Sequence, residues 1–387
     1  MCLTGDAFNL YVLIEVAALT GYGLIAMGSK RAAAATFNYV ILGTIGASLY
    51  LLGVGYIYIK TGTLNMVGIH DVIVGNDELA DSATMQVAFV LVVIGILIKM
   101  AFFPFHAWLP NAYSNAPTVT SSLLAPLVTK VMIYVMIRMV LSVFGVEFSF
   151  ESTLWVDVMP WLVVVAIICA AVMALAQREI KRMLAYLIVA EVGYMVGGVW
   201  IYNYYGLIGS IFHVISDACM TLCLFLGAGL ILRKAKTTHF DGLRGLFSKM
   251  PLTMTGFFIG GFSIIGLPPT CGFFSKWYLI TGGMVSQRWE YMVVLMFSTM
   301  VMVVLFFRLI ERIHLAVSES GENLGHGHGD LGLTKEQTRF DEGPLSMLIP
   351  LLLAATVVLV VGIYNQDIVN LIEIFLSEFN LPKGVGH

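Results

Sequence analysis

The stretch FVLVVIGILIKMAFFPFHAWLPNAYSNAPTVTSSLLAPLVTKVMIYVMIR, residues 89–138, decides the fold. It places two lysines, Lys99 and Lys130, in apolar sequence of helical length, with a proline- and aromatic-rich segment between them. An isolated ammonium group in hydrocarbon costs roughly 2.5–3.5 kcal/mol on membrane-insertion scales. We therefore expect both lysines to face a polar partner or water inside a membrane protein.

The composition indicates a polytopic helical membrane protein. The 387 residues are 59% hydrophobic and only 12% charged. The mean hydropathy of +0.89 is far above that of a soluble domain. Several apolar runs exceed the roughly 18 residues that span a bilayer. The formal net charge of −3 gives no sign of a nucleic-acid partner.

Hydropathy predicts ten membrane helices, at 7–28, 36–60, 84–104, 118–146, 154–177, 181–202, 205–232, 251–284, 289–313 and 345–364. Two of them are expected to be discontinuous. The chain after the third helix is interrupted around Pro104 and Pro110, and the eighth helix is interrupted at Pro268 and Pro269. Residues 365–387 contain an amphipathic pattern typical of a helix at the membrane interface.

The distribution of Lys and Arg predicts the orientation, because cytoplasmic loops are enriched in both. Most of the 21 Lys and Arg residues fall in loops on one side of the membrane. These are Lys30, Arg31, Arg178, Lys181, Arg182, Arg233, Lys234, Lys236, Arg244, Lys249, Arg308, Arg312, Lys335 and Arg339. The opposite side has Lys60, Arg138, Arg288 and Lys383. We expect the first side to be cytoplasmic, both termini to face outside, and the membrane to be the plasma (inner) membrane.

No cofactor or metal site is predicted. The polar segment 315–343 contains His326, His328 and Asp330, but the glycines between them favour a solvated cytoplasmic loop over a preorganised metal site. The five cysteines lie mostly in apolar runs and are interpreted as small buried hydrophobes. There is no CxxC pair and no glycine-rich nucleotide loop. Any electron transfer would therefore take place in partner subunits.

Ionisable residues within the apolar helices form a candidate proton relay. They are Glu15, Lys99, Lys130, Glu191, His213, Asp217 and Lys276. His213 and Asp217 are spaced i, i+4 and share one helix face. Carboxylates, lysines and a histidine that alternate through water can pass protons across a membrane. We expect Asp217 to be the counter-charge of His213.

Structural alternatives exist at each of these positions. Glu15 and Lys99 could form a static ion pair, and Lys130 could extend its ammonium from a helix end toward water. His213 could be a satisfied core histidine, while Glu191 and Asp217 could serve in capping or packing. A structural role for Lys276 is harder to find, because it follows a helix break. Broken helices at membrane depth are tolerated where they line a polar cavity, which favours the functional interpretation.

Several motifs carry a family resemblance, and they occur in order along the chain. They are Leu3–Val12 (LTGDAFNLYV) with Glu15, Gly53–Tyr58 (GVGYIY) with Thr61–Met66 (TGTLNM), Pro104–Pro110 (PFHAWLP) with Ala116-Pro117-Thr118, Lys181-Arg182 with Ala185-Tyr186 and Gly193-Tyr194, and Gly266–Pro269 (GLPP) with Gly272-Phe273 and Lys276. With these motifs the chain resembles the antiporter-like subunits shared by Mrp-type Na⁺/H⁺ antiporters, membrane-bound hydrogenases and respiratory complex I. The GVGYIY and TGTLNM segments are similar to the Mrp D-type subunit in particular.

The resemblance implies roles for five residues. Glu15 and Lys99 match the family's glutamate–lysine pair, Lys130 the connecting lysine, His213 the central histidine and Lys276 the exit lysine. The family geometry also implies that Lys130 approaches His213 from the other half-bundle. Glu191 stands where histidine or glutamine is common, and Asp217 stands near the position of a frequent lysine. These two acids are possible members of the same pathway.

The resemblance also implies an architecture. Family members have two inverted five-helix repeats, which would here form half-bundles at 1–177 and 178–364. The first contains Glu15, Lys99 and Lys130, and the second contains the other four ionisable residues. The family's first four helices have no counterpart, so we expect either a start upstream of Met1 or a shortened form.

Two function classes follow from the resemblance. The first is a proton-conducting subunit of a multi-subunit Mrp-like Na⁺/H⁺ antiporter. The alternative is a proton-pumping membrane subunit of a complex I-like oxidoreductase or membrane-bound hydrogenase. A membrane subunit that no longer conducts protons is a third, weaker hypothesis. The first two imply further membrane subunits, including another antiporter-like one.

Overall fold

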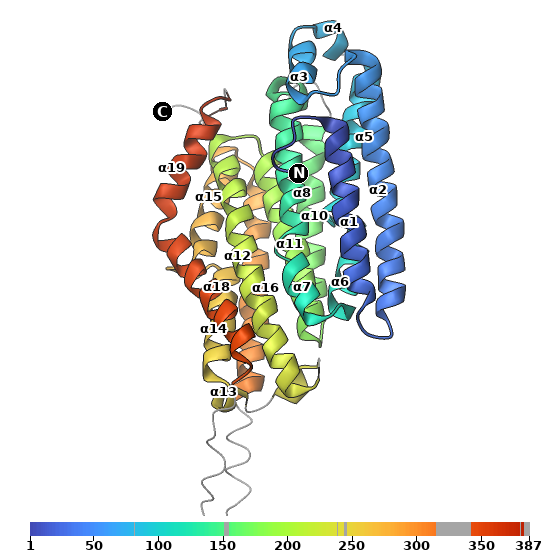
Figure 1. Cartoon of the computed structure of the whole chain (residues 1–387). Helices are drawn as coiled ribbons and strands as arrows, with labels where there is room; N and C mark the ends of the chain where they lie inside the picture. The colour runs from blue at the N-terminus through green and yellow to red at the C-terminus, as the bar shows by residue number, and fades with distance from the viewer. Residues whose placement is uncertain are drawn as a thin grey trace, which may run out of the picture.

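The computed structural model in Figure 1 describes residues 1–80, 82–150, 155–237, 239–243, 246–314, 342–379 and 381–382. Within these ranges the chain is helical, and two isolated β-bridges, Asp6 with Asn65 and Glu179 with His239, belong to no strand. Eight helices of this described part are long and apolar enough to cross a membrane. The predicted all-α membrane fold is confirmed at this level.

The amino-terminal helices form one edge of the bundle (Figure 1). They are α1 (Ala7–Ala26), α2 (Ala32–Thr61), α3 (Met66–Val74), α4 (Asp77–Ala80) and α5 (Ala83–Lys99). The Asp6 carboxylate caps α1 by accepting from the Asn9 amide at 2.7 Å, as an N-cap residue does. Helices α2 and α5 approach closely through glycines, because a Cβ on Gly95 would lie 2.6 Å from the Gly46 carbonyl oxygen. This packing fixes the end of α5, where Lys99 lies.

The chain after α5 is divided into short helices. They are the 3₁₀-helix η1 (Phe105–Ala107), α6 (Trp108–Asn115), α7 (Thr118–Leu124), α8 (Val128–Arg138), the π-helix η2 (Met139–Val143) and α9 (Val146–Phe150). Pro104 is the N-cap of η1, and Pro110 lies in the first turn of α6. A proline fits these positions because a first-turn amide has no intrahelical acceptor.

The predicted helix 118–146 is observed as a span over Thr118–Val143. It has an interruption between α7 and α8 that the sequence analysis did not predict. Pro126 lies in this interruption and has no amide hydrogen for the preceding turn. Side chains bind the carbonyl groups there: the Tyr113 hydroxyl donates to the Leu124 oxygen at 3.3 Å, and Lys130 Nζ donates to the Ala125 oxygen at 3.2 Å. The ammonium group of Lys130 therefore binds a carbonyl of the interruption that precedes its own helix.

The second part of the chain supplies the centre of the molecule. Its helices are α10 (Trp155–Leu175), α11 (Ile180–Trp200), α12 (Tyr204–Ala235), η3 (Phe240–Leu243), α13 (Leu246–Lys249), α14 (Pro251–Ile265), α15 (Cys271–Val285) and α16 (Trp289–His314). Helix α11 is the most enclosed span, with 94% of its apolar window buried. Helix α12 packs against α7, α8, α11, α14 and α15, so it joins both parts of the bundle. Glu191 on α11 and His213 and Asp217 on α12 are fully buried.

Helix α14 ends at Ile265 and α15 begins at Cys271, on either side of the Pro268-Pro269 pair. Gly266 ends α14 with a positive φ of 90°, which glycine adopts without steric strain. The two helices stay in close contact, because a Cβ on Gly272 would lie 1.9 Å from the Ser263 carbonyl oxygen. This junction places Lys276 one turn inside α15.

The carboxy-terminal helices are α18 (Leu345–Ile363) and α19 (Asn365–Leu376). Helix α19 packs against α12 and α18, and its Val369 and Ile372 are buried. It continues upward from α18 beside α15 in Figure 1. The histidines of the predicted polar loop, His326 and His328, lie outside the described residues.

Candidate functional site

The first ion pair joins α1 to the end of α5. Lys99 Nζ lies 2.5 Å from Glu15 Oε1. The lysine side chain is 6% exposed and that of the glutamate is 24% exposed. The structure therefore brings these two predicted residues together, with the carboxylate nearer to the surface of the bundle.

The second ion pair joins α8 to α12. Lys130 Nζ lies 2.9 Å from Asp217 Oδ2, and both side chains are buried. The ammonium also lies 3.2 Å from the Ala125 carbonyl oxygen and 3.4 Å from the Thr221 hydroxyl. Thr221 in turn donates to Asp217 Oδ1 at 2.6 Å. The buried ion pair between Lys130 and Asp217 therefore links α8 to the second part of the bundle.

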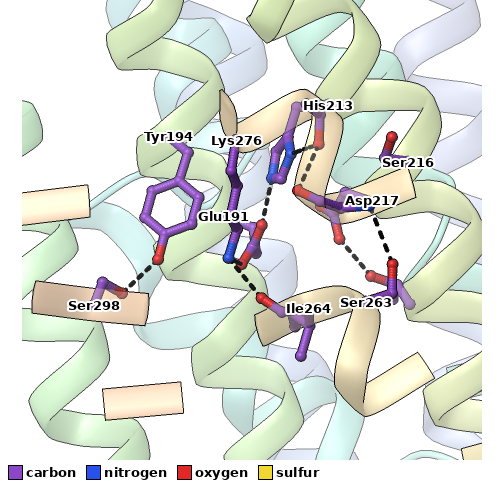
Figure 2. Close-up of polar contacts among 12 residues, drawn as sticks. Glu191, Tyr194, His213, Ser216, Asp217, Ser263, Ile264, Lys276 and Ser298 are labelled. Atoms are coloured by element: carbon purple, nitrogen blue, oxygen red, sulfur yellow. Dashed lines mark hydrogen bonds and ion pairs between the residues drawn. The ribbon is translucent and has the colours of Figure 1, made fainter. Parts of the chain in front are cut away.

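The third cluster is centred on Glu191 in α11 (Figure 2). One carboxylate oxygen contacts His213 Nε2, and the other lies 3.4 Å from Lys276 Nζ. The second ring nitrogen of His213 lies 2.8 Å from the Ser275 hydroxyl. Glu191 and His213 have no exposed side-chain surface. The Glu191 carboxylate thus contacts both a histidine from α12 and a lysine from α15.

The Lys276 ammonium is further enclosed by groups that bear no formal charge. It donates to the Ile264 carbonyl at 2.5 Å and lies 3.5 Å from Met302 Sδ. It also lies 4.9 Å from the centre of the Tyr194 ring, at cation–π distance. The Tyr194 hydroxyl bonds to Ser298 on α16 at 2.5 Å, as Figure 2 shows. Lys276 is therefore buried among these groups, and Glu191 is the carboxylate that it contacts among the described residues.

The expected pairing of Asp217 with His213 is wrong. Asp217 binds Lys130 and Thr221, and the partners of His213 are Glu191 and Ser275. The i, i+4 spacing does put both residues on one face of α12, but they lie one turn apart along the helix. Asp217 meets α8 there, whereas His213 meets α11 and α15.

Three of the lysines within the membrane helices are paired with acids. Three lysines (Lys99, Lys130 and Lys276) each contact one carboxylate (Glu15, Asp217 and Glu191). Pairing of this kind is needed for charges removed from water. Helices α1, α5, α8, α12, α11 and α15 supply the groups, and α5 packs on α8, α8 on α12, and α12 on α15. The three clusters thus lie on a continuous set of packed helices, and His213 belongs to the third cluster.

Comparison with known proteins adds the family. Residues 4–302 match the family model described as NADH:quinone oxidoreductase/Mrp antiporter, TM. The chain belongs to this family. The resemblance inferred from the sequence motifs is thereby confirmed, and the protein is a multi-pass integral membrane protein.

Two relatives correspond to the two kinds of protein named in the description of this family. The chain is 40% identical over 383 residues to the N-type subunit of an NADH-quinone oxidoreductase from Desulforudis audaxviator, covering 99% of this chain and 75% of the relative. It is 32% identical over 358 residues to the D-type subunit of a Na⁺/H⁺ antiporter from Alkalihalophilus pseudofirmus, covering 92% of this chain and 69% of that relative.

A solved relative shows the same fold. It is a chain of the membrane-bound sulfane sulfur reductase, an archaeal respiratory membrane complex, with a TM-score of 0.81 and 28% identity. The match covers 96% of this chain and 71% of that one.

The sequence analysis missed several contacts of this chain. Lys181 was counted as a loop residue, but it is buried and donates to the Ala116 carbonyl at 3.0 Å. Tyr194 was noted only as part of the Gly193-Tyr194 motif, with no role assigned to it. Met302 and Thr221 gave no signal, because a thioether or a hydroxyl in an apolar run is usually packing. Only their position beside a buried ammonium distinguishes them.

Proposed function

We propose that this chain is the proton-conducting subunit of a multi-subunit, Mrp-like monovalent cation (Na⁺)/H⁺ antiporter. The observation that carries the proposal is the series of three buried ion-paired clusters on packed helices. A static bundle gains little from buried ion pairs, because their desolvation offsets their attraction. Three such clusters in line are better accounted for by transport than by stability.

In this proposal a proton moves when a lysine approaches or leaves its carboxylate partner. A carboxylate holds a buried ammonium in its protonated form, and separation of the two favours release. Glu15 does this for Lys99, Asp217 for Lys130, and Glu191 for Lys276. Because Glu191 contacts both His213 and Lys276, it can favour one protonated partner over the other. The histidine is the group best suited to exchange protons near neutral pH.

The architecture we propose has two inverted five-helix repeats, at 1–177 and 178–364. In this scheme α5 with α6, and α14 with α15, are the halves of two discontinuous membrane helices. Lys99 lies at the end of α5 and Lys276 in the first turns of α15, each beside a break.

We further propose a plasma-membrane location with the Lys- and Arg-rich loops in the cytoplasm and both termini outside. The partners would be other membrane subunits, including a second antiporter-like one. The relatives support the proposal of partner subunits, because one is a subunit of a Na⁺/H⁺ antiporter and another belongs to a respiratory membrane complex.

A second candidate is the proton-pumping subunit of a respiratory oxidoreductase. The 40% identity to the N-type subunit of an NADH-quinone oxidoreductase favours it. Redox chemistry in other subunits would then drive proton movement along the same three ion-paired clusters. Co-purified subunits separate the candidates: iron–sulfur subunits support the oxidoreductase, and their absence from an active complex supports the antiporter.

The test is proton movement by the intact complex in vesicles that enclose a pH-sensitive dye. Lys276→Ala should abolish proton movement with subunit composition unchanged, because no other amine lies beside Glu191 among the described residues. Lys30→Ala, at an exposed loop lysine, is the control and should transport normally. Full activity of Lys276→Ala would exclude a continuous proton path through this chain.

A further inference from the structure

Lys181, at the start of α11, differs from the other buried lysines because no acid balances its charge. In the described part of the chain its Nζ contacts the Ala116 carbonyl at 3.0 Å and the Ser121 hydroxyl at 3.3 Å, but no carboxylate. The residue is 6% exposed, although a lysine near a helix end usually extends its ammonium group to water. An uncompensated buried charge is costly, which indicates a counter-ion from outside the described residues.

The next residue, Arg182, also lacks a partner. It is partly buried, and its enclosed Nε atom has no hydrogen-bond partner among the described residues. No carboxylate of that part of the chain contacts its guanidinium group. A guanidinium presents five donors in a planar fork that matches a phosphate or carboxylate group. Arg182 is therefore the side chain best suited to bind an anion here.

A third unpartnered group lies beside the same face of α11. Tyr186 follows Arg182 by one turn, and the centre of its ring lies 6.1 Å from that of His106 on η1. His106 is 6% exposed, and its Nδ1 atom has no hydrogen-bond partner in the described residues. Three side chains that can donate from nitrogen therefore lie beside the start of α11 without an acid.

The surrounding segments are rich in basic residues. Together the α1–α2 loop, the chain from η1 through α7, and residues 175–186 contain five Lys and Arg residues but one acid, Glu179. The loop lies against the end of α6, where the Ser29 amide donates to the Asn115 oxygen at 3.1 Å. Glu179 contacts His239 at 3.7 Å and does not cap α11 through its side chain. The positive end of the α11 dipole therefore adds to the basic charge.

We propose that Lys181, Arg182 and the start of α11 bind the phosphate group of an anionic phospholipid. The site lies in the first turn of a membrane-spanning helix, at the depth of lipid headgroups. Basic pockets between membrane helices are suited to anionic headgroups. The phosphate accepts from the Arg182 fork and from the remaining N–H of Lys181, with His106 as a further donor, while the acyl chains stay in the bilayer. This site does not depend on the proposed proton conduction.

The test compares two lipids on the intact complex after purification and removal of lipid. Phosphatidylglycerol is titrated in mixed micelles against phosphatidylcholine, which has no net charge, and the unfolding temperature is measured. Ligands that bind the folded state raise this temperature. We expect phosphatidylglycerol to raise it more than phosphatidylcholine does. Native mass spectrometry should find one more bound phosphatidylglycerol on the native complex than on Arg182→Gln.

Variants separate a built site from general attraction to a basic surface. Arg182→Gln should weaken phosphatidylglycerol binding by at least about tenfold, because hydrogen bonds between charged groups are lost. Arg182→Lys keeps the charge but not the fork, so its affinity should be intermediate. Arg178→Gln is the matched control, because this exposed arginine lies four residues earlier and its loss changes the net charge equally. It should retain the bound lipid.

Equal losses of lipid in Arg178→Gln and Arg182→Gln would show a diffuse attraction and overturn the proposal, as would equal responses to the two lipids. Inorganic phosphate, added at constant ionic strength, tests the headgroup without acyl chains. An Arg182-dependent effect of phosphate with none of phosphatidylglycerol would assign the site to free phosphate. Loss of another subunit from Arg182→Gln with unchanged bound lipid would assign it to an acidic segment of that subunit. Either result refutes the lipid site.

Discussion

Glu15 is the most exposed residue of the three ion pairs, at 24% against at most 6% for the others. Glu15→Gln keeps the shape and removes the charge that holds protonated Lys99. We expect coupled proton movement to slow by about tenfold or more, which corresponds to about 1.4 kcal/mol. Glu15→Asp keeps the charge at a longer distance and should be milder. Initial rates in vesicles check this, and a native rate in fully assembled Glu15→Gln would remove Glu15 from the mechanism.

Tyr194 offers a second prediction, because its ring and its hydroxyl can be removed separately. Tyr194→Leu removes the aromatic face from Lys276, a contact worth about 2 kcal/mol in a dry site. We expect its transport rate to fall at least tenfold and its pH–activity profile to change. Tyr194→Phe loses only the Ser298 bond and should stay near the native rate and profile. Equal losses in both variants would show that the hydroxyl, and not the ring, matters.

Residue spacing was a more reliable guide to which side chains are buried than to which residues they contact. Lys99 and Glu15 were paired through the family resemblance, and the structure places them in contact. The spacing of His213 and Asp217 gave a shared face of α12 but not the helices that pack on it. Partner choice depends on tertiary packing, which a single sequence with no alignment does not contain.

At the scale of elements, Gly362 tests how α18 supports the junction of α14 and α15. A Cβ on Gly362 would lie 2.1 Å from the Pro269 carbonyl oxygen, a backbone atom that cannot move alone. Gly362→Ala should therefore destabilise the protein by about 1–3 kcal/mol, as overpacking does. It should also slow transport, because the displaced segment leads directly to Lys276.

Gly55→Ala is the control for this prediction. No atom lies within 4 Å of an added Cβ on Gly55, which is inside α2. Alanine in place of a mid-helix glycine should stabilise by about 0.5–1 kcal/mol. The unfolding temperatures of both variants in detergent check the pair. A stable and active Gly362→Ala would mean that α18 can move away from the junction without effect.

The interruption at Ala125–Leu127 shows why some elements escaped prediction. Pro126 lies in an apolar run, and membrane helices tolerate proline when neighbouring groups satisfy the freed carbonyls. The side chains of Tyr113 and Lys130, which bind the Leu124 and Ala125 carbonyls at this interruption, come next to it only in the folded chain. The junction at Pro268-Pro269 was easier to predict, because two consecutive prolines follow a glycine.

At the scale of the whole molecule, hydropathy was sufficient for the class of fold. It predicted ten membrane helices, whereas eight helices of the described part are long and apolar enough to cross a membrane. It could not say which spans occupy the centre. The apolar windows of α10 and α11 both qualify as spans, yet 44% of one and 94% of the other are buried. The difference arises from helix packing, since lipid and protein interiors select similar side chains. Polar residues at depth, such as Glu191, were the better sign of a central helix.

Helix α1 carries the last prediction, which concerns a neighbouring subunit. Its outward residues Val12, Val16 and Leu19 are 39%, 53% and 63% exposed, and with Glu15 they follow the i, i+3, i+4, i+7 spacing of one helix face. A carboxylate on a face open to lipid is costly, so we expect another membrane subunit to cover it. The Glu15–Lys99 pair would then lie directly behind that interface.

A photo-crosslinking amino acid at Val16 or Leu19 should therefore capture a separate membrane polypeptide in the intact complex, identified by mass spectrometry. The same probe at Leu353, a 61% exposed position on α18 at the other side of the bundle in Figure 1, should not yield that product. Covering this face excludes lipid from Glu15 and lets the neighbour influence the charge that holds Lys99. If Val16 and Leu19 give only lipid adducts, the carboxylate faces the bilayer, and coupling between subunits must reach Lys99 by another route.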